Sequence, residues 1–340
     1  MNIKSVAEKA GVSVATISRV LNHPETVSES TKQHVLKVMD SLDYTPNWFA
    51  RGLKLNRTGV IGLLIPDILD SGYMEIAKGV EDVVRQKKHN MMLCTSNEDR
   101  SLEKEQVEHF LNRRVDGIIL VASLLKKKDI DMIKEQNVPV VFIGKDDEYA
   151  TENIVHTDFE TAGAEAANHL IEIGYDKIGV ICGKQPRQEN AQKLTGFKKA
   201  LNEANMSIDD ESIIYEENSI EGGFLGATKL IEKDPPQAIL ATSDMMAVGA
   251  MEKIKQSGLK IPDDIAVVGY DNLKISGFTE PKLTTVAKPV YRMGLIAARL
   301  LMDLIEDGQS EEEEVQEILI QSKLKIRKSS GRHDRLEEIF

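Results

Sequence analysis

The first 45 residues carry apolar side chains at the spacing of amphipathic helices and show no strand-like alternation. Gly11 is suited to end a first helix, and Ser13 and Ser28 are suited to cap a second and a third. Only Gly11, Val12 and Ser13 separate the first two helices, as a helix-turn-helix requires. The apolar positions of the three helices are Val6, Ala7 and Ala10; Val14, Ile17, Val20 and Leu21; and Val35, Leu36, Val38, Met39 and Leu42. This pattern predicts a small all-α helix-turn-helix head over residues 1–45.

The next segment, residues 46–58, has only a marginal helical tendency. Pro46 can open a short helix, whereas Gly52 weakens it. Helices this short seldom form alone in water. The segment is either a linker that folds only when it is docked or a plain tether.

From residue 59 onward, short apolar runs alternate with amphipathic helices, which is typical of parallel α/β sheets. A break near Thr157 to Gly163 divides the runs into two groups and predicts an α/β body of two doubly wound parallel-sheet lobes. Ligands of such sheets bind beyond the carboxyl ends of the strands, so two facing lobes would form one cleft. The predicted strands are 60–65, 91–95, 117–121, 138–143, 178–182, 238–241 and 265–268.

Length and composition agree with a folded chain of more than one domain. At roughly 150 residues per domain, 340 residues predict about two domains, and 41% hydrophobic with 29% charged residues is a globular composition. The sequence has neither an 18-residue apolar run nor a signal-peptide pattern, so we expect a cytoplasmic protein. Cys94 and Cys182 lie within apolar runs, and we expect reduced core thiols there, without a disulfide or a metal.

The charge is distributed unevenly along the chain. A net charge of −12 argues against nucleic-acid binding, because neutralising phosphates requires clustered Lys and Arg. Residues 1–58, however, contain eight basic and five acidic side chains, a net +3, which leaves −15 for the other 282 residues. This asymmetry is either chance scatter or a nucleic-acid-binding head on an acidic body.

Motifs of nucleotide and metal enzymes do not occur in the sequence. The segment Gly179 to Gln185 has one residue too few between its glycines for a phosphate-binding loop, and it lacks the Ser or Thr that would hold magnesium. No G-x-G-x-x-G pattern follows the first strand, and no H-E-x-x-H pattern occurs. We therefore expect no cofactor, no metal and no enzymatic activity.

Three aspartates follow predicted strands, at the positions where a ligand in the cleft would lie. They are Asp67, Asp244 and Asp271. Carboxylates can accept hydrogen bonds from paired sugar hydroxyls, and Tyr73 or Tyr270 could offer a ring face to the sugar. Capping of a following helix is the alternative role of an aspartate at such a position.

Motifs along most of the chain resemble those of the LacI family of bacterial repressors. The family implies a DNA-binding head (1–45), a hinge helix (46–58) and a periplasmic-binding-protein-like body (59–329) that forms a homodimer and binds a small effector, usually a sugar. Its lobes would comprise about 59–159 with 290–320 and about 160–288, and residues 330–340 would form a tail. The matching motifs are Val6-Ala7 with Gly11 to Asn22, Tyr44-Thr45-Pro46-Asn47, Ala50-Arg51-Gly52-Leu53, Ile65-Pro66-Asp67-Ile68, Val115 to Ile119, Thr195-Gly196-Phe197, Ser243 to Ala250, Val268 to Asn272 and Pro281 to Val286.

The resemblance also implies how the head would bind operator DNA. The second helix would enter the major groove, with Val14 and Ala15 as the specificity pair and Arg19 able to bond a guanine bidentately. Leu53 of the hinge would insert into the minor groove and kink the DNA. The residues implied to contact DNA are Ser13, Val14, Ala15, Thr16, Ser18, Arg19, Asn22, Ser28, Tyr44, Asn47, Ala50, Leu53 and Lys54.

The resemblance further implies an effector site in the cleft. Lys193 stands where the family often has Arg, and Lys288 where Gln is common. Two cations could pair with a ligand carboxylate or phosphate, which favours an acidic or phosphorylated sugar; alternatively, the lysines form salt bridges with Asp244 or Asp271. The implied effector-binding residues are Asp67, Tyr73, Lys193, Ser243, Asp244, Asp271 and Lys288.

Catabolite-control members of the family also bind a phosphorylated carrier protein through a basic helix motif. Here Arg299 is kept, but Met302 and Asp303 replace the Thr and Lys that help to bind it, so the sequence does not favour this partner. Two alternatives remain for the body, a secreted sugar receptor and an enzyme on the same lobes. The attached helix-turn-helix disfavours the first, and the lack of a nucleophile–base pairing disfavours the second.

Overall fold

The computed structural model describes residues 3–43, 57–184, 188–307 and 315–331 of the chain. These residues belong to two compact units, Met1–Thr58 and Gly59–Phe340, which we call the head and the body. None of the helices described there is long and apolar enough to cross a membrane.

The head contains the three predicted helices, α1 (Ile3–Ala10), α2 (Val14–Asn22) and α3 (Glu29–Ser41), with a short 3-10 turn η1 (Pro24–Thr26). The predicted helix end and helix caps are confirmed. Gly11, directly after α1, has a φ of +62°, a backbone conformation that favours glycine. The Ser13 Oγ accepts a hydrogen bond from the Thr16 backbone N–H at 3.1 Å, and the Ser28 Oγ accepts one from the Thr31 N–H at 3.3 Å.

A small core holds the three helices together. Val6, Ile17 and Val35 are fully buried, one from each helix. Two predicted core positions are wrong, because Val14 is 40% and Leu36 44% exposed. Val14 opens its helix next to the cap, where its side chain points away from the core that Ile17 and Val20 fill.

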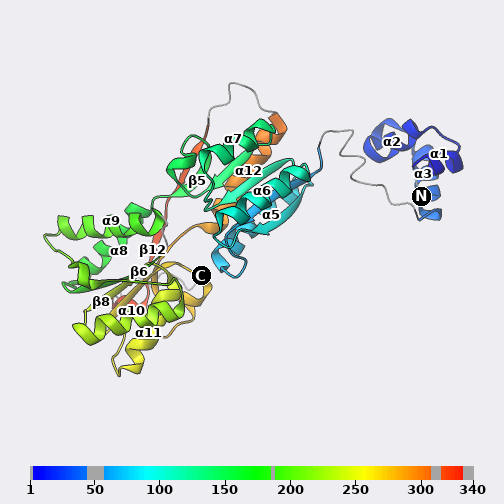
Figure 1. Ribbon diagram of the computed structural model, residues 1–340. Helices are drawn as coiled ribbons and strands as arrows, with labels where there is room; N and C mark the ends of the chain where they lie inside the picture. The colour runs from blue at the N-terminus through cyan, green and yellow to red at the C-terminus, as the bar shows by residue number, and fades with distance from the viewer. Residues whose placement is uncertain (1–2, 44–56, 185–187, 308–314, 332–340) are drawn as a thin grey trace. The chain divides into compact units, whose positions relative to one another are not determined.

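The body consists of two lobes, each a six-stranded sheet with helices on both faces (Figure 1). The strand order of the first sheet is β11-β5-β4-β3-β1-β2, and all of its neighbouring strands are parallel. Helices α5 and α12 cover one face, and α6 and α7 cover the other. The bounds are β1 (Val60–Ile65), α5 (Ser71–Gln86), β2 (Asn90–Thr95), α6 (Arg100–Asn112), β3 (Gly117–Val121), α7 (Lys127–Glu135), β4 (Val140–Ile143), η2 (Asp147–Tyr149), β5 (Asn153–Thr157), α12 (Val290–Asp307) and β11 (Glu317–Ile320).

The strand order of the second sheet is β12-β10-β9-β8-β6-β7, in which only β12 runs antiparallel to its neighbour. Helices α8 and α9 cover one face, and α10 and α11 cover the other. The bounds are α8 (Phe159–Ile173), β6 (Ile178–Gly183), α9 (Gln188–Glu203), η3 (Asp210–Ser212), β7 (Ile213–Glu216), α10 (Ile220–Lys233), β8 (Ala238–Ala241), α11 (Asp244–Gln256), β9 (Ala266–Asp271), η4 (Lys274–Gly277), β10 (Thr284–Ala287), β12 (Lys323–Lys325) and η5 (Lys328–Ser330).

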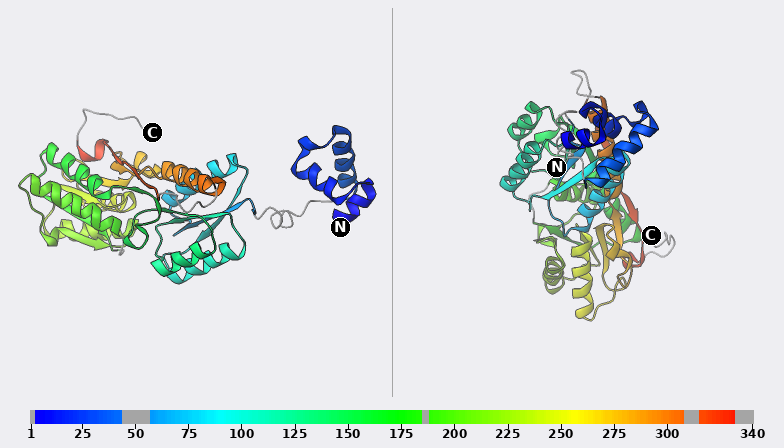
Figure 2. Two further views of the ribbon diagram at one scale, coloured as in Figure 1. Left: turned by 90° about the horizontal axis from the view of Figure 1, so that it is seen from above. Right: turned by 90° about the vertical axis from the view of Figure 1, so that its right-hand side faces the viewer.

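Among the described residues of the body, the chain crosses between the lobes three times, after β5, after β10 and between β11 and β12. Helix α12, orange in Figures 1 and 2, therefore packs beside α5 of the first lobe although it comes late in the sequence. The last crossing returns the chain to the second lobe, where the Ser330 hydroxyl lies 2.8 Å from the His169 Nε2. The predicted tail is thus wrong at its start, because Ser330 is buried.

Close helix packing positions α9, which contributes side chains to the site described below. A Cβ on Gly163 of α8 would lie 2.1 Å from the Lys193 carbonyl oxygen, and a Cβ on Gly196 would lie 1.8 Å from the Glu160 carbonyl oxygen. Only glycine allows backbones to approach this closely. The two glycines therefore fix the depth at which α9, and with it Lys193, lies in the second lobe.

Candidate functional site

A cleft of about 560 Å³ lies between the two lobes of the body. The first lobe contributes the segment after β1, from Asp67 to Ile76, and the start of α12. The second lobe contributes the start of α9 and the segments that follow β8, β9 and β10. The cleft thus lies at the carboxyl ends of strands from both sheets, as predicted from the sequence.

Six of the seven predicted effector-binding residues line this cleft, and one does not. The six are Asp67, Tyr73, Lys193, Ser243, Asp271 and Lys288. Asp244 is the exception: it opens α11 one residue after the cap Ser243 and is 0% exposed. The prediction that Asp244 contacts a ligand is therefore wrong.

The Asp244 carboxylate instead joins the start of α11 to strand β10 and to the loop after β9. Its Oδ1 accepts a hydrogen bond from the Thr285 hydroxyl at 2.5 Å, and its Oδ2 accepts one from the Leu273 backbone N–H at 2.7 Å. Burial, together with the nearby Asp271 charge, raises the pKa of Asp244 well above its usual range. Asp244 therefore does not face the cleft itself, but its hydrogen bond to Leu273 holds the loop after β9, and this loop lines the cleft.

Two lysines in the cleft share one carboxylate, Glu189 of α9. The Lys193 Nζ lies 2.9 Å from the Glu189 Oε1, and the Lys288 Nζ lies 3.2 Å from both Glu189 oxygens. Burial alone would raise the pKa of Glu189, but the two ammonium groups hold it well below its usual range. The salt bridges predicted as an alternative role for the lysines thus exist, but with Glu189 and not with Asp244 or Asp271.

Asp271 ends β9 in an unusual backbone conformation. Its φ is +108°, and that of Asn272 is +58°, a region that non-glycine residues seldom adopt. Burial raises the pKa of Asp271 to about 7, although the charges of Lys193 and Lys288 oppose this shift. Strained backbone of this kind is typical of functional sites, and here it presents a carboxyl group to the cleft.

Polar groups on the first-lobe wall are acceptors with capacity for further hydrogen bonds. The Asp67 Oδ1 accepts a bond from the Leu69 N–H at 2.9 Å, and the Asp70 Oδ1, which caps α5, accepts one from the Gly72 N–H at 2.7 Å. An ionised carboxylate has about four lone-pair sites. Each aspartate can therefore accept bonds from ligand hydroxyls while it keeps its own loop in place.

In the head, α2 presents side chains that are free of the core. Val14, Ala15 and Arg19 are exposed, whereas Ile17 and Val20 are buried. Ser13 and Ser28 form the caps of their helices. Thr16 is half-buried and its hydroxyl lies 2.9 Å from the Ser13 hydroxyl, Ser18 is half-buried, and Asn22 is the last residue of α2. The predicted DNA contacts Tyr44, Asn47, Ala50, Leu53 and Lys54 lie outside the described residues.

Comparison with known proteins identifies both units. Residues 2–47 match the model of bacterial regulatory proteins of the lacI family, and residues 58–328 match the model of periplasmic binding proteins and the sugar-binding domain of the LacI family. The chain belongs to the LacI family. It is a DNA-binding transcriptional regulator, as the sequence motifs predict.

Individual relatives agree with this assignment over nearly the full chain. Catabolite control protein A of Priestia megaterium is 34% identical over 303 residues, which cover 88% of this chain and 91% of that protein. The structure of the lac repressor dimer bound to operator and an anti-inducer has a TM-score of 0.86 at 26% identity, covering 97% of this chain and 99% of that one. The structure of the regulator CelR in complex with cellobiose has a TM-score of 0.72 at 29% identity, covering 97% of this chain and 99% of that one.

Several cleft residues of this LacI-family chain were missed by the sequence reasoning. They are Asp70, Glu75, Glu189, Asn190, Asn218 and Arg292. Glu189 lies four residues before Lys193, the spacing at which helical side chains meet, so the i,i+4 rule could have found it. Arg292 lies in the first turn of α12, a helix correctly assigned to the first lobe, but no local sequence pattern indicates that this residue faces the cleft.

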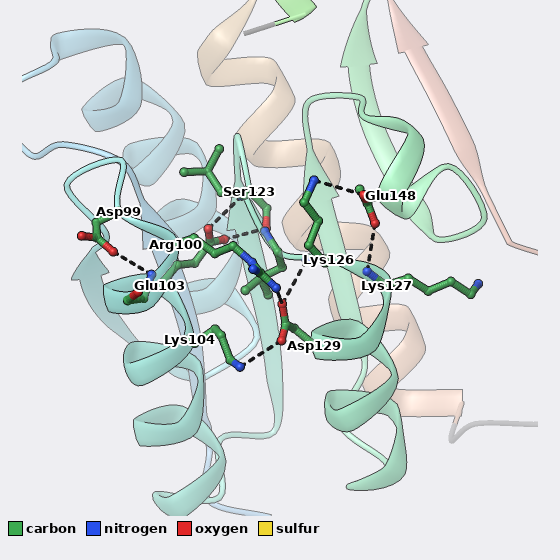
Figure 3. Close-up of polar contacts among 12 residues, drawn as sticks. Asp99, Arg100, Glu103, Lys104, Ser123, Lys126, Lys127, Asp129 and Glu148 are labelled. Carbon is green, nitrogen blue, oxygen red and sulfur yellow. Dashed lines mark hydrogen bonds and ion pairs between the residues drawn. The ribbon is translucent and has the colours of Figure 1, made fainter. Parts of the chain in front are cut away.

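A separate polar cluster joins α6 and α7 in the first lobe (Figure 3). Asp129 is paired with Arg100 at 2.5 Å and Lys104 at 3.1 Å, while the Glu103 carboxylate accepts bonds from the Ser123 hydroxyl and the Leu124 N–H. Burial would raise the pKa of Asp129, but these partners lower it to about 2. The charges of the cluster are matched within it, so its role is to fix the two helices to the end of β3.

The positions in α12 that correspond to the carrier-protein motif of catabolite-control relatives are partly buried. Arg299 and Asp303 of α12 are exposed, whereas Met302 is 0% exposed and belongs to the core of the first lobe. Met302 is therefore not available to a docking protein.

Proposed function

We propose that this chain is a repressor that binds a pseudopalindromic operator as a homodimer and is controlled by a small sugar-like effector in the cleft. The observation that carries the proposal is the cleft itself. Acceptor carboxylates and polar side chains from both lobes converge on a cavity of about 560 Å³, a volume suited to a small ligand. A ligand bound between the lobes would alter their mutual arrangement, because it binds the two arrangements with different affinity.

The DNA-binding role is supported by the exposed residues of α2. Arg19 would donate bidentate hydrogen bonds to a guanine, while Val14 and Ala15 lack hydrogen-bonding side chains and would contact apolar groups such as a thymine methyl. Ser13, Ser18, Asn22, Ser28 and Tyr44 would contact phosphates or neighbouring bases.

Residues 46–58 would act as the hinge in this proposal. Leu53 would wedge into the minor groove, flanked by Ala50 and Lys54 and preceded by Asn47, and the few kcal/mol of unstacking would be offset by wider contact with the bent DNA. Folding of the hinge would then be coupled to operator binding, which gives the effector a means of control.

Two solved relatives support the proposal of a dimeric, sugar-responsive repressor. One solved relative is titled as a repressor dimer on operator DNA and another as a complex with cellobiose. We transfer to this chain a dimeric, sugar-responsive mode of action, cytoplasmic location, and ligand binding without catalytic turnover.

Selection of bound sequences from random DNA tests this proposal, with the full-length chain at fixed salt, with and without a panel of sugars. We expect an enriched palindrome with a central C-G step whose recovery changes with one ligand. Enrichment of no sequence under any condition would overturn the proposal. Conversion of a panel sugar to a product would contradict the absence of turnover.

A further inference from the structure

We infer that Glu189 is a specificity-determining residue of the cleft. It forms salt bridges with Lys193 and Lys288, the two lysines that would otherwise bind an anion. The effector is thereby restricted to uncharged, polyhydroxylated molecules. The inference rests on the proposed function, because it assumes that the cleft binds the effector. It replaces the acidic or phosphorylated sugar favoured from the sequence, a hypothesis that requires Lys193 and Lys288 to be available to a ligand anion.

Lys193 has no donor left for a ligand anion. An ammonium group has three N–H donors. The Lys193 Nζ lies 2.9 Å from the Glu189 Oε1 and donates to the Thr242 carbonyl oxygen at 3.1 Å. It also lies 3.8 Å from the centre of the Tyr270 ring, a cation–π distance, and its side chain is 5% exposed. Lys193 is therefore part of the wall of the cleft.

Lys288 also pairs with Glu189, although its side chain is more exposed to the cleft than that of Lys193. Its Nζ is 3.2 Å from each Glu189 oxygen and 5.0 Å from the centre of the Phe159 ring, and its side chain is 15% exposed. A phosphate or carboxylate that approached Lys288 would have to displace Glu189 or lie against it. Both cost energy, because like charges repel and because a displaced buried carboxylate loses its partners.

The remaining charges of the cleft also disfavour anions. The charged side chains that line it in the described part of the chain are five carboxylates and three cations: Asp67, Asp70, Glu75, Glu189 and Asp271, against Lys193, Lys288 and Arg292. Asp271, whose pKa lies at about 7, contributes only part of a charge, but without it four carboxylates still face three cations, and an anionic ligand would add a negative charge to this excess. Hydroxyl groups, in contrast, can donate to the carboxylates, so a neutral polyol satisfies the same walls.

Matched pairs of ligands test the inference on the unmodified protein. Binding is measured by calorimetry and by thermal stabilisation for glucose against glucose 6-phosphate, glucose against glucuronate, and ribose against ribose 5-phosphate. For each sugar that binds, we expect the neutral member to bind at least about tenfold more tightly, which is about 1.4 kcal/mol. Equal or tighter binding of the anionic member would overturn the inference while the proposed function stands.

A variant pair isolates Glu189 without depending on the effector. Glu189→Gln keeps the shape of the side chain but removes the carboxylate that both buried ammonium groups contact. The Asp271 carboxyl still attracts them, but their charge is no longer matched by a salt bridge, so an added anion gains two partners. Glu75→Gln is the matched control, since it removes one carboxylate from the same cleft but leaves the lysine pairs intact. Inorganic phosphate is the probe, and chloride at equal ionic strength is the reference.

We expect phosphate to stabilise Glu189→Gln and to gain at least about tenfold in affinity over the unmodified protein, with a gain under about threefold for Glu75→Gln. Equal gains in phosphate affinity in the two variants would show that the loss of any one negative charge in the cleft is sufficient, and would overturn the assignment to Glu189. If Glu189→Gln is too unstable to assay, the ligand pairs on the unmodified protein decide. If neither sugars nor phosphate bind to any form, the proposed role of the cleft fails, and the inference with it.

Discussion

Replacing Asp244 with alanine separates a structural role from a ligand-binding one. The carboxylate is 0% exposed and accepts hydrogen bonds from the Thr285 hydroxyl and the Leu273 N–H. Asp244→Ala removes both acceptors at a position that is 0% exposed. The Thr285 hydroxyl and the Leu273 N–H then lose the acceptor of their hydrogen bonds.

The expected cost follows from these two donors. A buried donor that loses its acceptor costs about 1–3 kcal/mol, so with two such donors the free energy of unfolding of the body should fall by about 2–6 kcal/mol. For a unit of this size, each kcal/mol lowers the melting temperature by roughly 2–4 °C, so a loss of about 3 kcal/mol corresponds to roughly 6–12 °C. Asp244→Asn keeps one acceptor oxygen and should cost less than the alanine variant.

Thermal and urea unfolding at one protein concentration measure the effect, since dimerisation makes the midpoint depend on concentration. Asp67→Ala is the matched control, because Asp67 lies at the cleft surface and its change should cost less than about 1 kcal/mol. The reasoning would be refuted by an Asp244→Ala protein of unchanged stability that binds ligand weakly. That result would place Asp244 in direct contact with the effector.

Three further predictions concern the DNA-binding residues and the pH dependence of stability. Arg19→Ala should cost about 1–3 kcal/mol of operator binding and relax base choice at one position in each half-site, as measured by binding-site selection; unchanged selectivity would exclude the guanine contact. Leu53→Ala should weaken specific binding and reduce DNA bending in a gel-based bending assay, whereas an unaltered bend would rule out the wedge. Asp271, whose pKa burial raises to about 7, keeps a proton in the folded state that the unfolded state loses above its ordinary value of 3.8. Stability should therefore fall as the pH rises from about 4 to about 7 and then level off, and Asp271→Asn should flatten this part of the profile in melting experiments; an identical profile for the variant would disprove the shift.

The parts of the fold that were predictable are those with strong local signals. The caps Ser13 and Ser28 and the left-handed Gly11 define the head, because each solves a local backbone problem that only a few residue types can solve. Strands β1, β3 and β8 were predicted with the bounds observed, since strands buried on both faces are continuous apolar runs.

Strands β5, β7, β10, β11 and β12 were not predicted. They are three to five residues long and contain polar positions such as His156 in β5 and Thr284 and Thr285 in β10. Their place in the sheets depends on pairing with strands far away in the sequence, which no local pattern encodes. The wrong start of the tail has the same cause, because Ser330 is buried through contacts with residues more than 40 positions away.

The site was predictable as a location and only partly as a set of contacts. Of the seven effector-binding residues predicted from strand ends and family motifs, six line the cleft. These signals did not distinguish Asp271, which lines the cleft, from Asp244, which supports it from behind, since both are aspartates next to strand ends. The lysines were interpreted by charge alone, and only the geometry assigns both of them to Glu189.

The most direct test of the account is the operator affinity of the full-length chain with and without a neutral sugar that binds the cleft, in the unmodified protein and in Asp271→Ala. We predict that the sugar changes the operator Kd of the unmodified protein by about 5–150-fold, the usual range of allosteric coupling, and that Asp271→Ala needs far more sugar for the same change. An operator Kd that stays the same at saturating sugar would contradict the claim that the cleft controls DNA binding.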